Sequence, residues 1–137
     1  MVSYKIWSGD RAVLVNIYTT KWRMHSASLI YKRTWNLDNS THGTLGTCYR
    51  WWLDPDKKNK IVSLILMSWD TLTIDVLSHE LLHAAVHIWT YDKEDEGKLL
   101  STKNDEELAY IHSNLFEDIL SLFTENDMKK LIKNHNV

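Results

Sequence analysis

The chain has 137 residues, a length that suits one domain. Apolar residues make up 44% of it and charged residues 25%, so the composition predicts a packed core and excludes an intrinsically disordered chain. The single cysteine, Cys48, excludes an internal disulfide and a cysteine-rich zinc finger. Because no apolar run approaches about 18 residues and the first residues lack the pattern of a secretory signal, we expect a cytoplasmic protein with no membrane partner.

Charge is divided unevenly along the chain. Residues 1–68 carry ten Lys or Arg against four acids, a net charge of +6, whereas residues 69–137 carry six against fourteen, a net charge of −8. A basic half suggests nucleic acid as a partner. No recognised nucleic-acid-binding motif occurs, so we expect the two halves to differ mainly because one is rich in strands and the other in helices. The oligomeric state does not follow from the sequence.

The first half of the chain predicts β-strands. Residues 11–20 fit a strand or the start of a helix, and residues 26–36 fit a second strand because they are rich in β-favouring side chains. Residues 36–46 contain Asn, Asp, Ser and Gly, which predicts a loop.

A β-hairpin is predicted next. Residues 44–53 are aromatic and β-favouring, residues 60–69 are apolar, and Pro55 lies in a turn signal between them. The second segment is apolar almost throughout, which predicts a strand buried on both faces.

From Asp70 onward the apolar spacing becomes helical. Asp70 or Thr71 is expected to cap a helix that ends near Trp89. A charged connection leads to a second helix from about Asn104 or Asp105, and residues 125–137 predict a short terminal helix. The predicted fold is therefore one α+β domain over residues 1–137, with a small antiparallel sheet packed against the first helix and the helix that follows it.

The first helix carries the motif His79-Glu80-x-x-His83. Side chains four residues apart lie on one face of a helix, so both imidazoles can reach one metal ion at about 2.0–2.1 Å. Glu80 would lie beside that ion as a general base, which is the H-E-x-x-H arrangement of zinc hydrolases. His87 is one turn further along, too far for one ion to bind both His79 and His87. Its role stays open between the core, support of the site and an alternative ligand.

The competing interpretation is a buried helix with hydrogen-bonded core histidines. The motif lies among apolar residues, namely Leu81, Leu82, Ala84, Ala85 and Val86. Burying histidines and a glutamate there without partners would be costly, and a metal ion supplies the partner. This context favours zinc.

A catalytic zinc needs a third protein ligand and an open position for water. Here the sequence resembles the gluzincins, the zinc peptidases typified by thermolysin, in which that ligand is a glutamate on a following helix, often in the pattern E-x-x-A. Glu106 to Ala109 match this pattern. The resemblance therefore implies Zn²⁺ held by His79, His83 and Glu106, with Glu107 as the fallback ligand.

The resemblance covers residues 60 to about 116, and two departures qualify it. Tyr110 stands where the thermolysin type has an aspartate. The residue that stabilises the oxyanion in larger relatives comes from regions that this chain lacks, and His25, His42, His112 and Tyr110 are the candidates to replace it. The domain is similar in size to small zincin-like proteins from phages and mobile elements.

The sequence predicts a zinc metallopeptidase that hydrolyses a peptide or protein substrate, with Glu80 as the general base. An extended substrate is expected to pair with the strand at residues 60–69. The alternative is a zincin-fold protein that binds zinc without significant hydrolysis and acts by binding a host or partner protein.

Overall fold

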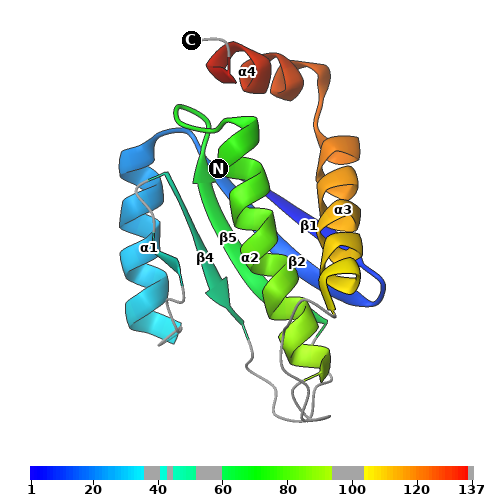
Figure 1. The fold of residues 1–137 in the computed structure, drawn as a ribbon. Coiled ribbons are helices and arrows are strands. Elements are labelled where there is room, and N and C mark those ends of the chain that lie inside the picture. The colour runs from blue at the N-terminus through cyan, green and yellow to red at the C-terminus, as the bar shows by residue number, and fades with distance from the viewer. Residues whose placement is uncertain (36–40, 43–44, 52–59, 94–103, 136–137) are drawn as a thin grey trace.

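The computed structural model describes the chain except residues 36–40, 43–44, 52–59, 94–103 and 136–137 (Figure 1). The described elements form an α+β fold in which a mixed sheet separates one helix from the others. In chain order they are β1 (Val2–Ser8), β2 (Arg11–Tyr18), α1 (Lys21–Trp35), β3 (Thr41–His42), β4 (Gly46–Arg50), β5 (Ile61–Ser68), α2 (Ile74–Lys93), α3 (Asp105–Leu122) and α4 (Glu125–His135).

The sheet has the strand order β1-β2-β5-β4-β3. Three of its neighbouring pairs are antiparallel, but β2 and β5 run parallel, so the prediction of a purely antiparallel sheet is wrong. Parallel neighbours need a long connection that returns the chain to the same end of the sheet. Helix α1 lies within that connection. The sequence interpretation did not predict α1, made no prediction for β1, and assigned the residues of β3 to a loop.

Residues 26–36 were expected to form a strand, and the structure corrects this to the helix α1. Thr20 starts the helix, because its hydroxyl accepts a hydrogen bond from the Arg23 N–H at 3.2 Å. Met24 and Ser28 are buried and Tyr31 is partly buried, a helical spacing that faces the sheet. The apolar run at residues 29–31 resembles a strand only when it is considered without the residues of the first turn of the helix.

Apolar side chains fill both faces of the sheet. Met24 of α1 packs with Tyr49, Leu64 and Leu66 on one face. The other face holds the larger core, beneath α2, α3 and α4, and its members include Val13, Val15, Ile17, Ile65, Met67, Leu77, Leu81, Ala84, Ala85, Ile88, Leu115 and Ile119. Strand β5 contributes to both cores and is buried from Val62 to Ser68, which confirms the predicted hairpin and its buried second strand.

Helix α2 begins later than the sequence predicts. Thr73 caps it, because the Thr73 hydroxyl accepts from the Val76 N–H at 3.1 Å and the Thr73 carbonyl accepts from the Leu77 N–H at 3.0 Å. The expected cap, Asp70, instead accepts from the Lys21 N–H at 3.1 Å and so connects to the start of α1. The helices α3 and α4 are present as predicted.

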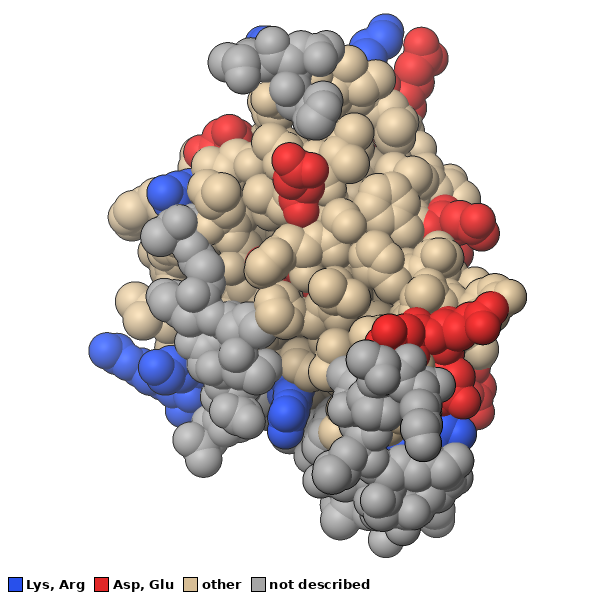
Figure 2. Space-filling view, in the orientation of Figure 1, with Lys and Arg blue, Asp and Glu red and all other residues tan. Residues whose placement is uncertain are grey.

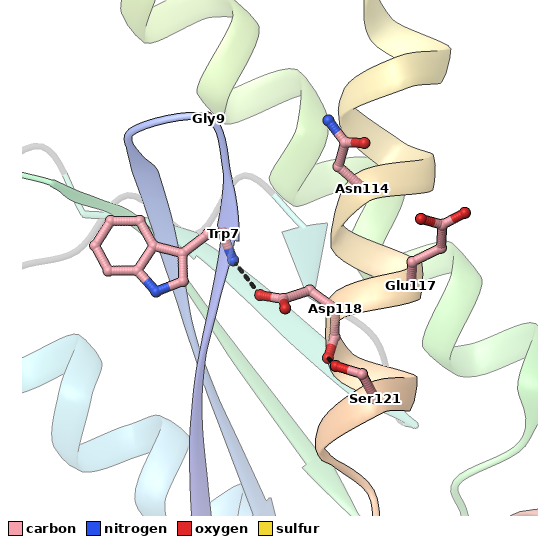
Figure 3. A pocket seen from close by; sticks show the side chains of 6 residues that line it. All are labelled: Trp7, Gly9, Asn114, Glu117, Asp118 and Ser121. Atoms are coloured by element: carbon pink, nitrogen blue, oxygen red, sulfur yellow. Dashed lines mark hydrogen bonds between the residues drawn. The ribbon is translucent and has the colours of Figure 1, made fainter.

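Helix α3 is fastened to the outer strand of the sheet beside a pocket of about 450 Å³ (Figure 3). The Trp7 N–H donates to Asp118 Oδ2 at 2.7 Å, and the Asn114 amide donates to Ser8 Oγ at 3.2 Å. The unpaired edge of a sheet can form hydrogen bonds with a strand of another chain. Asp118 accepts from one of the backbone N–H groups of β1, so that donor is not available for such pairing. Within the described part of the chain, no helix has the length and apolar character to cross a membrane.

Candidate metal centre

The two histidines of the motif converge on the outer side of α2. Their Nε2 atoms are 3.1 Å apart, and the rings meet edge to face with centroids 4.7 Å apart. Two imidazole nitrogens bound to one tetrahedral zinc ion lie about 3.3 Å apart, as follows from bond lengths of about 2.0–2.1 Å. The pair therefore fits two ligands of one ion. The same distance also fits a hydrogen bond between two neutral imidazoles, so the geometry alone does not identify a metal.

Burial favours the neutral form of one of these rings. The pKa of His83 is lowered, first because burial penalises the charged imidazolium and then because His79 is close. A metal ligand must be deprotonated, and a lowered pKa keeps the nitrogen lone pair of His83 available near neutral pH.

Glu80 lies on the flank of α2 that faces β4. It is only 4% exposed, and its Oε2 atom has no hydrogen-bond partner in the described part of the structure. Burial raises the pKa of this carboxyl group from 4.5 to about 7. A buried, unpartnered carboxyl group is costly, and such groups are concentrated at functional sites.

Gly46 provides the space that Glu80 occupies. A Cβ atom at position 46 would lie 3.0 Å from both Cγ and Oε1 of Glu80, closer than nine in ten real Cβ contacts. The sequence interpretation missed this residue. A glycine beside β-favouring residues is a signal for close approach to a strand, but only the structure identifies what approaches it.

Steric coupling between the two positions predicts a measurable interaction. Gly46→Ala should lower the free energy of unfolding by about 1–3 kcal/mol, as expected when a packed site receives an extra methyl group. In a Glu80→Ala background, Gly46→Ala should lower the free energy of unfolding by clearly less, because the side chain that it would crowd is absent. Chemical denaturation of the four proteins measures this difference.

Gly9→Ala is the matched control. Gly9 has φ +62°, and nothing lies within 4 Å of the added Cβ. The loss of unfolding free energy in Gly9→Ala therefore comes from backbone conformation and should be equal in the wild-type and Glu80→Ala proteins. Equal costs of Gly46→Ala in both backgrounds would contradict the assigned crowding.

His87 lies in the core, one turn beyond His83. It is 3% exposed, its Nδ1 is 2.8 Å from Ser63 Oγ, and Cys48 Sγ is 3.7 Å from the same nitrogen. The pKa of His87 is lowered to about 3, first by burial and then by the charges of Arg50 and His83. Of the roles left open by the sequence, the structure supports a core residue held by hydrogen bonds.

The neutral burial of His87 predicts a pH dependence of stability. Its pKa is about 3 when folded against 6.5 when free, so the unfolded chain binds more protons between these values. The stability that His87 contributes is thus present above pH 6.5 and falls by up to about 1.4 kcal/mol per unit as pH drops toward 3. Chemical denaturation at a series of pH values, with a chelator present, should show a shallower dependence of the unfolding free energy on pH for His87→Asn than for the wild type. An unchanged slope would exclude His87 as the source.

Glu106 lies away from the histidine pair. It is exposed in the first turn of α3. Two contacts show that α3 runs antiparallel to α2. Near the start of α3, Trp89 Nε1 donates to Glu107 Oε2 at 2.8 Å, and further along α3, His112 Nε2 lies 3.1 Å from the Ser78 carbonyl. No group of three His, Cys, Asp or Glu side chains that could hold one metal ion exists within the described residues.

Helix periodicity explains this separation. Ser78 and Trp89 share the face of α2 that contacts α3, since a separation of eleven residues is just over three whole turns. His79 and His83 are displaced from that face by about 100–140° around the helix axis. Glu107, the fallback ligand, is engaged with Trp89. The structure therefore brings together His79 and His83, places Glu80 on the adjoining flank of the same helix, and does not bring Glu106 to the pair.

The candidates for oxyanion stabilisation are scattered. His112 contacts Ser78 and lies 6.1 Å from the Phe116 ring between centroids, and Tyr110 is 65% exposed on α3. His25 belongs to α1, on the other face of the sheet, and the side chain of His42 lies outside the described part of the structure. Among the described candidates, no contact identifies one side chain as the group that stabilises the oxyanion.

The predicted substrate strand also needs correction. Residues 60–69 were expected to pair with an extended substrate, but β5 is the central strand and pairs with β2 on one side and β4 on the other. Its hydrogen-bonding edges are already used. Among the described strands, the sheet edge on the Glu80 side belongs to β4 and the two-residue strand β3.

No family model, curated protein or solved structure matches this chain. Its own residues and their geometry therefore carry the functional argument.

Proposed function

We propose that the chain is a zinc-dependent metallopeptidase in which His79 and His83 hold the metal and Glu80 is the general base. One observation carries the proposal: two imidazoles whose Nε2 atoms are 3.1 Å apart lie on the same helix as a buried carboxyl group without a hydrogen-bond partner among the described residues. A simple core helix has no need of this combination, whereas H-E-x-x-H chemistry requires it.

The chemistry assigned to Glu80 follows from its environment. A zinc ion bound by the histidine pair would activate water and polarise the scissile carbonyl group. The Glu80 carboxylate would take a proton and later return it to the leaving amine. Its pKa of about 7 suits this exchange, because a base is most effective when its pKa is near the working pH.

The described residues fit the zinc only in part. They supply two converging nitrogen ligands, while a catalytic zinc site normally has three protein ligands. Glu106 stays a prediction from the gluzincin resemblance, and it would join the pair only if the first turn of α3 lay closer to His79 and His83 than it does here.

The second candidate function is a zincin-fold protein that binds zinc without significant hydrolysis and acts on a partner protein. The scatter of the oxyanion candidates among the described residues favours it, because hydrolysis needs a group that stabilises the oxyanion. The retained Glu80 favours the peptidase, because a zinc ion with a purely structural role needs no neighbouring base.

Zinc content tests the proposed ligands. Protein purified without added metal should carry about one zinc ion per chain, and His79→Ala or His83→Ala should remove most of it because each takes away a direct ligand. His112→Ala is the control, since that ring contacts Ser78 instead of the pair. Zinc retained in His79→Ala would contradict the assignment.

The same measurement examines the third ligand. Glu106→Gln should weaken zinc binding if the gluzincin resemblance holds, whereas Glu107→Gln should not, because the glutamine oxygen can still accept from Trp89. Full zinc occupancy in Glu106→Gln would exclude that carboxylate.

Turnover of an internally quenched peptide library decides between the two functions. Glu80→Gln should keep the zinc and the fold but reduce hydrolysis by about 10²–10⁴-fold, because the amide cannot accept the proton. Glu117→Gln, an exposed change on α3, should leave hydrolysis unchanged. If the zinc-loaded wild-type protein cleaves nothing, or if Glu80→Gln retains full turnover, the peptidase proposal is wrong.

A further inference from the structure

Helix α1 exposes large apolar side chains on the side that faces away from the sheet. Trp22 is 75% exposed, Leu29 58% and Ile30 63%. A surface helix normally carries polar residues on its outer side, with its apolar stripe turned to the core. In α1 the inner side is also apolar, through Met24 and Tyr31, so the helix has two apolar sides and only one of them is covered by the sheet.

Cations surround the outer side chains of α1. The helix carries Lys21, Arg23, Lys32 and Arg33, and it contains neither aspartate nor glutamate. At about 100° per residue, Arg33 falls between Trp22 and Ser26 on the outer side, while Arg23 and Lys32 lie on its two flanks. Basic side chains gather at the lower left of Figure 2, over the end of α1, whereas acidic ones gather on the right, over α3.

A hollow of about 370 Å³ adjoins this side of α1. Met1, Trp22 and Ile30 contribute apolar walls, and Arg23 contributes a cation. Met1 and Val2, the first residue of β1, are also exposed, at 65% and 43%, and extend the apolar surface beyond the helix. The outer side of α1 and this hollow form one surface, which we call the α1 surface.

Three kinds of partner can be compared by how well they match the apolar and basic side chains of the α1 surface. A second copy would bring cations against cations. Nucleic acid would use the cations and Trp22, but it offers nothing to bury Leu29, Ile30 and Met1. Exposed apolar side chains flanked by Lys and Arg are the pattern of helices that lie in the interface of an anionic membrane.

We propose that the α1 surface binds the anionic surface of a lipid bilayer. Trp22, Leu29 and Ile30 enter the interface, and Arg23, Lys32 and Arg33 contact the lipid phosphates and carboxylates. This attachment is peripheral and independent of the proposed zinc chemistry. It revises the expectation of no membrane partner, because the absence of a spanning segment does not exclude peripheral attachment through a surface helix.

Co-sedimentation with vesicles tests the proposal. The full-length protein should bind vesicles of phosphatidylcholine mixed with phosphatidylserine at least about tenfold more strongly than vesicles of phosphatidylcholine alone, and added salt should weaken the binding. Trp22→Ser with Ile30→Ser, and separately Lys32→Glu with Arg33→Glu, should each reduce binding to the anionic vesicles by about tenfold or more. All four residues are exposed, so circular dichroism spectra should match the wild type.

Matched substitutions elsewhere provide the control. Leu122→Ser with Ile132→Ser removes two apolar side chains, 44% and 50% exposed, from α3 and α4, and Lys133→Glu reverses a charge on α4. Neither change should alter vesicle binding. The proposal fails if the wild-type protein does not bind the anionic vesicles, or if the variants of the α1 surface bind as well as the controls. Binding of a single-stranded DNA oligonucleotide in place of vesicles would assign the surface to nucleic acid and overturn the proposal.

Discussion

The packing of α2 against β4 and β5 decides where every residue of the candidate site lies. Leu77, Leu81, Ala84 and Ile88 are buried against the sheet, and this fixes the rotation of the helix about its axis. With Leu81 turned inward, the preceding residue, Glu80, must lie on the flank that faces β4. The chemistry proposed for this protein therefore depends on an apolar contact that takes no part in it.

The same rotation turns the histidine pair toward solvent. His79 is exposed and His83 is partly buried, so an ion in solution has access to their nitrogens without opening the core. His87 shows the contrast, because one further turn carries it inward to Ser63 and Cys48. Three histidines at equal spacing thus occupy two different environments, and only two of them can act together.

Much of the fold could be predicted from sequence, because hydrophobic periodicity is a local signal. It located the buried strand β5, its hairpin partner β4 and the helices α2, α3 and α4. It failed at α1, where the apolar residues on both sides of the helix hide the period of 3.6, and the missing helix also concealed the parallel pairing of β2 with β5. The histidine pair was predictable because i, i+4 spacing is a property of the helix itself. The positions of Gly46 and Glu106 were not, because each depends on how one element packs against another.

The α1 surface and the histidine pair lie on opposite faces of the sheet, so each can be altered without touching the other. The proposed peptidase depends on the two Nε2 atoms of the pair holding one zinc ion. X-ray absorption at the zinc edge tests it most directly, because outer-shell scattering counts the imidazoles bound to the metal. We expect two imidazoles in the wild-type protein, one in His83→Ala loaded with excess zinc, and two in His87→Asn. A zinc spectrum without imidazole scattering, or one unchanged by His83→Ala, would contradict it.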